Sequence, residues 1–370
     1  MLYLSLGIIQ TILFEAHFII YVTIRDMFGL NGETLFVFKI IIVILSVSFL
    51  LTSFLARVFQ NKIVRFAYTV AATWFGFLIY FLLAAALYWI MVFVGGNHIS
   101  HSDASCAGIF FMTIATCMGI YGLLNANHIR IRHITVGIPS LPKIWNERKA
   151  VMLSDIHFGQ IKSVAFAEKI SKIILNLKPD IMFLVGDVFD GVKTNTDACL
   201  SPLGKINPPL GSFFVLGNHE EFEGTSTKYY TDAIRKAGIS VLDNEKITID
   251  GVEIIGVVDS HTSNKKRYDE LLKKIIDENK NPRILLKHTP VFTDVAEAEG
   301  VDLELSGHTH GGQFFPINLI TPFIFKNRNY GLSRFKTMTT YTSSGVGTWG
   351  PPMRIGTNPE IVVISFENTP

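Results

Sequence analysis

Val151-Met152-Leu153-Ser154-Asp155-Ile156-His157-Phe158-Gly159 is the stretch of this chain that decides its fold. An apolar run ends abruptly in Asp-x-His, and a glycine follows soon after. Residues i and i+2 of a strand point to the same face, so a carboxylate and an imidazole lie side by side at the carboxyl end of a strand. Because so short a motif also recurs by chance, it is weak evidence for a metal site when taken alone.

Four later segments repeat this arrangement, since each supplies Asp, Asn or His and nearly every one follows an apolar run. They are Gly186-Asp187, Gly217-Asn218-His219-Glu220, Lys287-His288 and Gly307-His308-Thr309-His310. Strands of one sheet that end in such residues bring them to a common edge. Together these segments predict one metal site at the edge of a sheet.

The second half of the chain alternates between strand and helix patterns. A strand at 149–153, a helix at 164–177 and a strand at 181–185 form a βαβ unit. The alternating segment 129–136 predicts a half-exposed strand that joins the same sheet. Further strands are expected at 212–216, 241–258 with a turn at Asp250-Gly251, 283–286, 303–305, 340–343 and 361–365, with helices at 229–237 and 268–278 and a proline-containing loop at 201–211.

The first part of the chain is much more apolar than the rest. The 370 residues are 49% hydrophobic and only 17% charged, and charges are sparse before about residue 125. Four apolar stretches exceed the ~20 helical residues that cross a bilayer, namely Leu2–Ile24, Leu35–Phe59, Tyr68–Val94 and Ala104–Leu124. The alternative, a soluble bundle of four buried helices, rarely contains runs of this length. We therefore predict a transmembrane region over 1–125, a connector over 126–148 and a catalytic domain over 149–370.

The charges of the connecting segments predict an orientation. The second connection carries Arg57, Lys62 and Arg65, whereas residues 95–103 contain no Lys or Arg. The positive-inside bias puts the second connection and the catalytic domain on the cytoplasmic side of the plasma (inner) membrane. The net charge of +2 gives no case for a nucleic-acid partner.

The ordered set Asp-x-His, Gly-Asp, Gly-Asn-His-Glu, His and Gly-His-x-His resembles the calcineurin-like metallophosphoesterase superfamily over residues 149–366. The tail that runs from Gly345 to Ile361 looks like the bacterial branch of membrane-associated phosphoesterases. The resemblance implies the metallophosphoesterase fold, a two-layer mixed β-sandwich flanked by helices, with two metals at the sheet edge. For the whole chain we expect a four-helix transmembrane region followed by this α/β domain.

The resemblance also implies a role for each motif residue. It assigns one metal to Asp155, His157 and His310, the other to Asn218, His288 and His308, and the bridging position to Asp187. Nitrogen-rich ligation suits Mn, Fe or Zn better than Mg or Ca, so two divalent ions of that group are the expected cofactors.

Beyond the ligands, His219 is expected to stabilise the phosphate and to protonate the leaving oxygen. Asp190 either orients a ligand histidine or is a plain loop carboxylate. Arg354 either clamps the substrate phosphate or is an ordinary surface or salt-bridging arginine. Glu220 stands at a position where the family accepts Asp or Glu, so it carries little information.

The function implied by the resemblance is hydrolysis of a phosphodiester or pyrophosphate bond by a metal-bridging hydroxide. The membrane half makes a lipid-linked phosphoester one candidate substrate and the membrane a partner, while a soluble phosphodiester or cyclic nucleotide is the alternative substrate. A second interpretation is a non-catalytic metal-binding scaffold or sensor. A third is a transporter with a regulatory domain, against which four spans without a charged pathway or paired broken helices argue.

Overall fold

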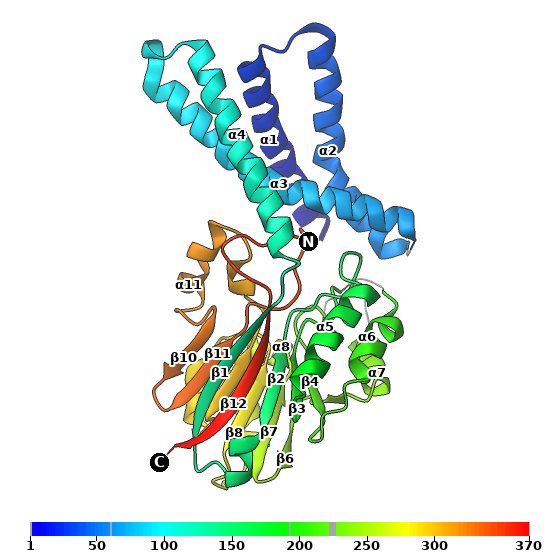
Figure 1. The fold of residues 1–370 in the computed structure, drawn as a ribbon, viewed down its shortest axis with the longest axis vertical. Coiled ribbons are helices and arrows are strands. Elements are labelled where there is room, and N and C mark those ends of the chain that lie inside the picture. The colour runs from blue at the N-terminus through cyan, green and yellow to red at the C-terminus, as the bar shows by residue number, and fades with distance from the viewer. Residues whose placement is uncertain (1, 60, 192–193, 222–226, 370) are drawn as a thin grey trace. The chain divides into compact units, whose positions relative to one another are not determined.

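The computed structural model describes residues 2–59, 61–191, 194–221 and 227–369 and contains two compact units (Figure 1). The first unit is Met1–Leu124 together with Gly350–Met353. The second is Asn125–Trp349 together with Arg354–Pro370. The first unit is built from helices, and the second holds two β-sheets with their helices.

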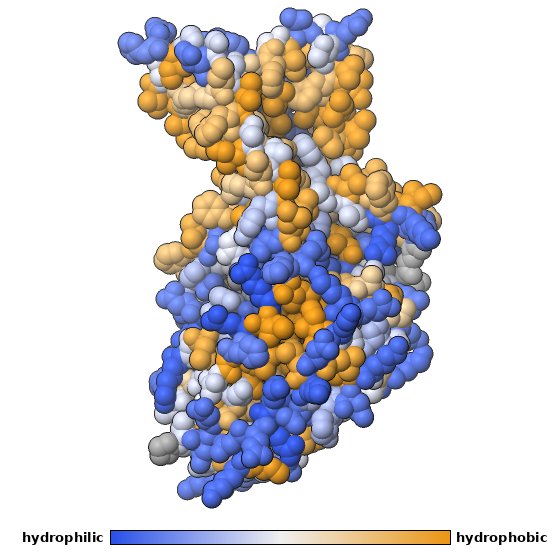
Figure 2. Space-filling model, in the orientation of Figure 1, coloured by the Kyte–Doolittle hydropathy of each residue, from blue (hydrophilic) through white to orange (hydrophobic). Residues whose placement is uncertain are grey.

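The helical unit contains α1 (Leu2–Phe28), α2 (Gly32–Val58), α3 (Lys62–Gly95) and α4 (His101–Asn125). All four are long and apolar enough to cross a membrane, as the sequence predicts. Figure 2 shows apolar side chains over the outer surface of these helices. The helices extend beyond the apolar stretches because residues such as Arg25, Lys62 and Arg65 also have good or fair helix propensity.

Polar side chains inside the helical unit join α1 to α3. Trp74 donates its indole N–H to Nε2 of His17 at 2.9 Å, and Nδ1 of His17 lies 2.7 Å from the carbonyl oxygen of Leu13. Trp89 likewise donates to the Thr23 hydroxyl at 2.9 Å. Hydrogen bonds of this kind hold apolar helices together where hydrophobic burial cannot. They give His17 a packing role between α1 and α3.

The second unit contains two six-stranded sheets. The first has the strand order β1-β12-β2-β3-β4-β5, and the second has the order β10-β11-β9-β8-β7-β6. The strands are β1 (Arg130–Pro139), β2 (Lys149–Leu153), β3 (Ile181–Val185), β4 (Ser212–Val215), β5 (Ser240–Val241), β6 (Glu245–Ile249), β7 (Val252–Val257), β8 (Arg283–Lys287), β9 (Leu303–Ser306), β10 (Gly331–Phe335), β11 (Met338–Thr342) and β12 (Glu360–Thr369).

Strand β1 confirms the prediction that the connector adds a strand to the sheet. It pairs in parallel with β12, from Arg130 opposite Glu360 to Pro139 opposite Thr369. Strand β12 in turn pairs antiparallel with β2, while β2, β3 and β4 are parallel to one another. The result is the mixed sheet expected from the resemblance.

Alternation along the buried strands fixes the layers. In β3, Ile181, Phe183 and Val185 pack between the two sheets with residues of β7, β8 and β9. Met182 and Leu184 point the other way, toward the helices on the outer face. A strand buried on both faces therefore reads as one continuous apolar run. The helices are α5 (Val164–Leu177), α6 (Thr196–Gly204), α7 (Thr227–Lys236), α8 (Asp259–Thr262), α9 (Lys265–Ile275), α10 (Thr293–Ala298) and α11 (Thr321–Ile324).

The prediction of a loop at 201–211 is wrong for residues 201–204, because these four residues form the end of helix α6. The Asn195 side chain accepts a hydrogen bond from the backbone N–H of Ala198 at 3.1 Å and caps this helix. Pro202 lies inside the last turn of α6. A proline is a strong breaker signal, but a short buried helix can absorb one near its end. Strand β10 was not predicted either, because apolar and polar residues alternate only weakly along it.

A buried network on β7 predicts acid sensitivity. Glu253 is 1% exposed, and its carboxylate accepts from Lys246 at 2.7 Å, Asn279 at 2.9 Å and Arg283 at 3.0 Å. Burial by itself would raise the pKa of Glu253, but these donors hold it below its usual value. The network therefore stabilises the fold fully at neutral pH, and that stability is lost as the pH falls through the lowered pKa.

We expect Glu253→Gln to reduce the free energy of unfolding by about 1–3 kcal/mol at neutral pH. The difference from wild type should shrink as the pH falls below the ordinary pKa of a glutamate and through the lowered pKa of Glu253, because the wild-type carboxylate then becomes protonated. Urea unfolding of both proteins at neutral and at acid pH measures this difference in free energy. Glu270→Gln, at an exposed side chain, is the control. A difference that is independent of pH would contradict this account.

Candidate metal centre

The motif residues follow the carboxyl ends of strands from both sheets. Asp155 comes two residues after β2, Asp187 two residues after β3, and Asn218 three residues after β4. In the other sheet, His288 directly follows β8 and His308 comes two residues after β9. Since these strands are parallel within each sheet, their ends meet at one edge. The structure brings all seven predicted ligands to that edge.

One group of donors consists of Asp155, His157 and His310. All three are buried, and their candidate ligand atoms lie within 4.8 Å of one another. Nε2 of His310 is 3.4 Å from Oδ1 of Asp155 and 3.0 Å from Nε2 of His157. This is the group that the resemblance assigns to the first metal.

The second group consists of Asp187, His288 and His308, again within 4.8 Å. Nε2 of His288 is 3.0 Å from Oδ2 of Asp187, and Nδ1 of His308 is 2.8 Å from Oδ1 of Asn218. The same Asp187 oxygen lies 4.0 Å from Nε2 of His157, in the first group. Asp187 therefore lies between the two groups.

The arrangement of these donors fits a pair of divalent ions. Nε2 of His288 is completely buried and makes no hydrogen bond of acceptable geometry, although Asp187 is near. Nε2 atoms of His157 and His310 face each other at 3.0 Å. Two imidazole nitrogens bound to one zinc at 2.0–2.1 Å would be about 3.0–3.5 Å apart. Histidine and carboxylate donors together suit Mn, Fe or Zn.

The pKa shifts at this edge reflect the same crowding of charges. Burial would raise the pKa of Asp187, but His288 and the neighbouring histidines hold it far below its usual range. Burial lowers the pKa of His310, and the Arg354 guanidinium lowers it further. Burial and His288 likewise lower the pKa of His308. Despite burial, Asp187 raises the pKa of His288 well above its usual value, and Asp190 and Asp187 raise the pKa of His157. The carboxylates therefore favour a positive charge on these two rings, and bound cations would supply that charge in place of the protons when the histidines act as ligands.

Backbone conformation also marks the predicted ligands. Asp155, His157, Asp187, His308 and His310 all have positive φ, between 50° and 70°. This left-handed region is unfavourable for residues with a side chain and is held only when the surrounding fold imposes it. Strain that recurs at five predicted ligands supports a functional role for this edge.

Two motif glycines are required by close packing against the ligands. A Cβ atom on Gly217 would lie 2.2 Å from Oδ1 of Asp187, and one on Gly307 would lie 2.5 Å from Oδ2 of Asp155. Since the carboxylates cannot move without leaving the centre, only glycine leaves room for them. The Gly-Asn and Gly-His parts of the motifs therefore have a steric cause.

The residues predicted to assist catalysis lie beside the ligands. Nε2 of His219 is 3.9 Å from Oδ2 of Asp187, and its backbone N–H donates to the same carboxylate at 2.9 Å. Oδ1 of Asp190 is 3.2 Å from Nδ1 of His157 and 3.8 Å from Nδ1 of His219. Asp190 therefore lies beside the side of the His157 ring that faces away from His310. The indole ring of Trp349, whose role the sequence did not suggest, meets the His219 ring edge-on with centroids 6.3 Å apart.

Glu220 contributes far more than the sequence suggested. Its carboxylate is fully buried and accepts three backbone N–H bonds, from Gly217 at 2.9 Å, Asp187 at 3.0 Å and Phe189 at 2.8 Å. It therefore joins the loop after β3 to the loop after β4, and so fixes Asp187 relative to Asn218. The acceptance of either acid at this position is the signal for this role, since both supply a carboxylate.

We expect Glu220→Gln to weaken metal binding by about 10- to 100-fold. The amide keeps the shape but replaces one acceptor oxygen with an N–H donor that faces a backbone N–H. Hydrolysis of a chromogenic phosphodiester as a function of Mn²⁺ concentration measures the shift, and the rate should largely recover at saturating metal. Glu221→Gln, which removes a carboxylate bonded to Ser260 outside the centre, is the control. Loss of rate with unchanged metal dependence would contradict a positioning role.

The structure gives Arg354 a different place from the predicted phosphate clamp. Its side chain is completely buried, and its guanidinium donates to the carbonyl oxygens of Gly347 and Ser344, both at 2.7 Å for Nη2. The same Nη2 lies 3.0 Å from Nδ1 of His310. The guanidinium N–H groups of Arg354 are thus directed at these atoms. Arg354 supports the His310 ring at Nδ1, on the side opposite the candidate ligand atom Nε2.

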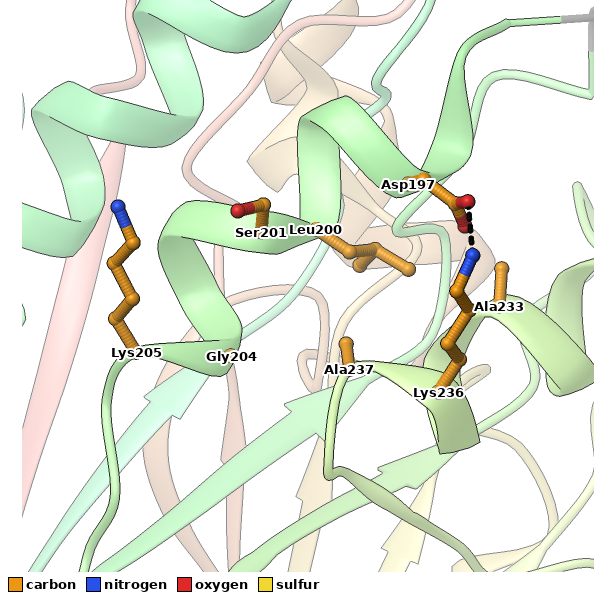
Figure 3. A pocket seen from close by; sticks show the side chains of 8 residues that line it. All are labelled: Asp197, Leu200, Ser201, Gly204, Lys205, Ala233, Lys236 and Ala237. Atoms are coloured by element: carbon orange, nitrogen blue, oxygen red, sulfur yellow. Dashed lines mark hydrogen bonds and ion pairs between the residues drawn. The ribbon is translucent and has the colours of Figure 1, made fainter.

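A hollow of about 380 Å³ lies apart from this centre, between α6 and α7 (Figure 3). Asp197 and Lys236 form an ion pair across it, and Leu200 and the alanines of α7 line its wall. None of the predicted site residues line this hollow.

Comparison with known proteins places the same motifs in a family. The family model described as Calcineurin-like phosphoesterase matches residues 148–312. An uncharacterized metallophosphoesterase of Aquifex aeolicus is 35% identical over 263 residues, which are 69% of this chain and 98% of that protein. The transmembrane protein with metallophosphoesterase domain of Danio rerio is 30% identical over 288 residues, covering 72% of this chain and 65% of that protein.

Among solved structures, TT1561 of Thermus thermophilus is similar with a TM-score of 0.37 and 12% identity, covering 54% of this chain and 89% of that one. The sequence relatives are both bacterial and eukaryotic, so the likeness extends beyond the bacterial branch. The match spans nearly the whole length of the Aquifex protein, and the family model spans the motifs from Asp155 to His310. This chain therefore belongs to the calcineurin-like metallophosphoesterase family.

Proposed function

We propose that this chain is a membrane-anchored phosphoesterase that uses two divalent metal ions to hydrolyse a phosphodiester or pyrophosphate bond. One observation carries the proposal. The side chains of Asp155, His157, Asp187, Asn218, His288, His308 and His310 converge on one edge with donor spacings suited to metal ligation. In this proposal, Asp187 is shared between the two ions.

Two divalent ions held in this way supply positive charge that stabilises the phosphoryl oxygens and activates water at neutral pH. The chain itself supplies the geometry. Glu220 fixes the loop that carries Asp187, and Asp190 holds the His157 ring through its Nδ1 atom. Arg354 supports the His310 ring from the side away from the ligand nitrogen. Each ligand is thus restrained before a substrate arrives.

His219 is assigned to the substrate rather than to a metal. Burial and the adjacent His157 lower the pKa of His219, which favours a neutral ring at pH 7. A neutral imidazole donates a hydrogen bond from one nitrogen and accepts at the other. His219 can therefore stabilise a phosphoryl or leaving-group oxygen through its N–H.

The four apolar helices are assigned to a membrane anchor, with the metal centre on the cytoplasmic side. The basic residues Arg57, in the last turn of α2, and Lys62 and Arg65, in the first turn of α3, support this orientation. This orientation is tested by fusing to the C-terminus a reporter enzyme that works only outside the cytoplasm. We expect the fusion to be inactive, and an active fusion would reverse the assignment.

The proposed activity is tested with the full-length protein purified in mild detergent. Metal analysis should find about two divalent ions per chain, and Mn²⁺-loaded protein should hydrolyse bis-p-nitrophenyl phosphate. Removal of metal by EDTA should abolish the rate, and Mn²⁺ should restore it. His219→Ala should lower kcat by about 100-fold or more with metal content unchanged, while the exposed His133→Ala on β1 should behave as wild type.

If the protein binds two ions but hydrolyses no phosphoester, the scaffold or sensor interpretation replaces the enzyme. If it binds no metal, both interpretations are wrong. Hydrolysis that survives complete removal of metal would contradict the role of the donor groups.

A further inference from the structure

The segment that follows His310 carries an apolar face that is exposed on the structure. Six of the ten residues from 315 to 324 are large apolar side chains that are at least 40% exposed. We call these six the apolar face: Phe315, Ile317, Leu319, Ile320, Phe323 and Ile324. Phe323, at 84%, is almost fully exposed. Exposed apolar side chains gathered in one short segment of a folded domain favour a site of interaction.

The apolar face is built directly on the loop that holds two predicted ligands. Thr309, between His308 and His310, donates its hydroxyl to the carbonyl oxygen of Asn329 at 2.5 Å. Asn329 in turn donates to the hydroxyl of Thr321, at the start of α11, at 3.2 Å. The Phe325 ring meets the His308 ring edge-on with centroids 6.1 Å apart. The apolar face is therefore tied to the metal centre by short contacts.

A second exposed aromatic side chain adjoins the centre. Trp349 is 57% exposed, and its ring contacts that of His219. The Gln313 side chain fixes this tryptophan, because it donates to its carbonyl oxygen at 2.8 Å and accepts from its N–H at 3.0 Å. Aromatic rings thus adjoin two histidines of the centre, which suits a substrate with an apolar part beside its phosphate.

Charge and composition identify what the apolar face contacts. From 313 to 336 the chain contains Lys326, Arg328, Arg334 and Lys336 but no acidic residue, and of these Lys336 pairs with Glu297 at 2.7 Å. Apolar and aromatic side chains together with a basic rim are the composition of elements that lie in the headgroup region of a bilayer and attract anionic lipid. The same chain carries four helices that are apolar enough to span a membrane, so a bilayer is the available partner.

We propose that the apolar face lies in the lipid interface and binds the acyl part of the substrate. Resting on the proposed function, this assigns the substrate class: an amphiphilic phosphoester, presented from a bilayer, whose phosphate enters the metal centre. Lys326 and Arg328 face the lipid phosphates. In this proposal the basic side chains attract the anionic lipid headgroups, and the exposed aromatic rings insert into the lipid interface.

Contact with lipid is tested without reference to activity. The full-length chain is reconstituted in phosphatidylcholine nanodiscs with or without brominated acyl chains. Fluorescence is compared for Phe323→Trp and for Ile247→Trp, which is 39% exposed on β6, at the opposite edge of the sheet from β10. We expect brominated lipid to quench the added emission of the first variant and not that of the second. Equal behaviour of the two variants would overturn the proposal, whatever the enzyme hydrolyses.

Substrate class is tested with a matched pair of chromogenic phosphodiesters, hexadecyl p-nitrophenyl phosphate in vesicles and ethyl p-nitrophenyl phosphate in solution. Loss of two anchoring side chains in Phe323→Ser/Ile324→Ser should reduce kcat/KM for the long-chain ester by roughly 10- to 100-fold. The same variant should leave the rate on the ethyl ester unchanged, and Ile247→Ser should change neither.

An equal loss on both esters, or no loss on either, would overturn the assignment of the acyl part. If wild-type protein hydrolyses neither ester, the proposed function fails instead, and the quenching experiment still decides whether the face contacts lipid.

Discussion

Asp187→Asn is expected to reduce kcat/KM on a chromogenic phosphodiester by roughly 10³-fold or more. Asp187 lies between the two donor groups, 3.0 Å from His288 and 4.0 Å from His157. An amide keeps the size of the side chain but removes the negative charge and one acceptor oxygen, so it cannot be shared between two cations. The metal content should therefore fall from about two ions per chain to one or fewer.

Two control variants separate this effect from a general loss of charge. Asp190→Asn, which alters the carboxylate beside Nδ1 of His157 and of His219, should reduce kcat/KM by about 10- to 100-fold. Asp232→Asn, on an exposed side chain of α7, should match wild type. Metal analysis and kinetics on the same samples measure both quantities. Wild-type rate with two ions bound in Asp187→Asn would refute the shared-ligand assignment.

Lys287→Met is expected to lower the free energy of unfolding of the catalytic domain by about 3–5 kcal/mol. Lys287 and Glu304 are buried side chains, with 0% and 1% exposed, and form an ion pair of 3.3 Å between β8 and β9. Methionine fills the space of the lysine stem but leaves the Glu304 carboxylate buried without its cation. Denaturant unfolding of the full-length protein in detergent, followed by tryptophan fluorescence, measures the loss.

The double variant Lys287→Met/Glu304→Leu should regain most of this stability, because it removes both buried charges. Lys228→Met provides a matched control, since that lysine is 79% exposed and its pair with Asp232 should contribute at most about 1 kcal/mol. A loss in Lys287→Met no larger than in Lys228→Met would show that the buried pair contributes little.

Many of the strands along the chain and most of the donor set follow from local sequence. An apolar run that ends in Asp-x-His or Gly-Asp specifies a strand, its end and the residue that follows, all within a few positions. That is why the ends of β2, β3, β8 and β9 agree with prediction to within a residue or two. The helix at Val164–Leu177 was predicted with its observed ends, because its apolar face repeats regularly.

What the sequence did not reveal depends on contacts between distant residues. Glu220 binds backbone N–H groups some 31 to 33 residues away, and a sequence pattern does not say which amides a carboxylate reaches. Arg354 could point outward or inward with equal ease, and only the packed structure shows its donors directed at carbonyl oxygens. The positive φ of the ligands is likewise imposed by the packed loops.

The position of β12 has a consequence for how this protein is made. Strand β1 directly follows the last membrane helix, but its partner in the sheet is β12, 230 residues later. At about 5–20 residues per second on the ribosome, β1 would wait roughly 10–45 s before its partner is synthesised. During that interval the apolar helices can insert into the bilayer, while β1 and β2 lack the strand that lies between them. Insertion of the helices can thus precede completion of the first sheet, which waits until translation reaches residue 369.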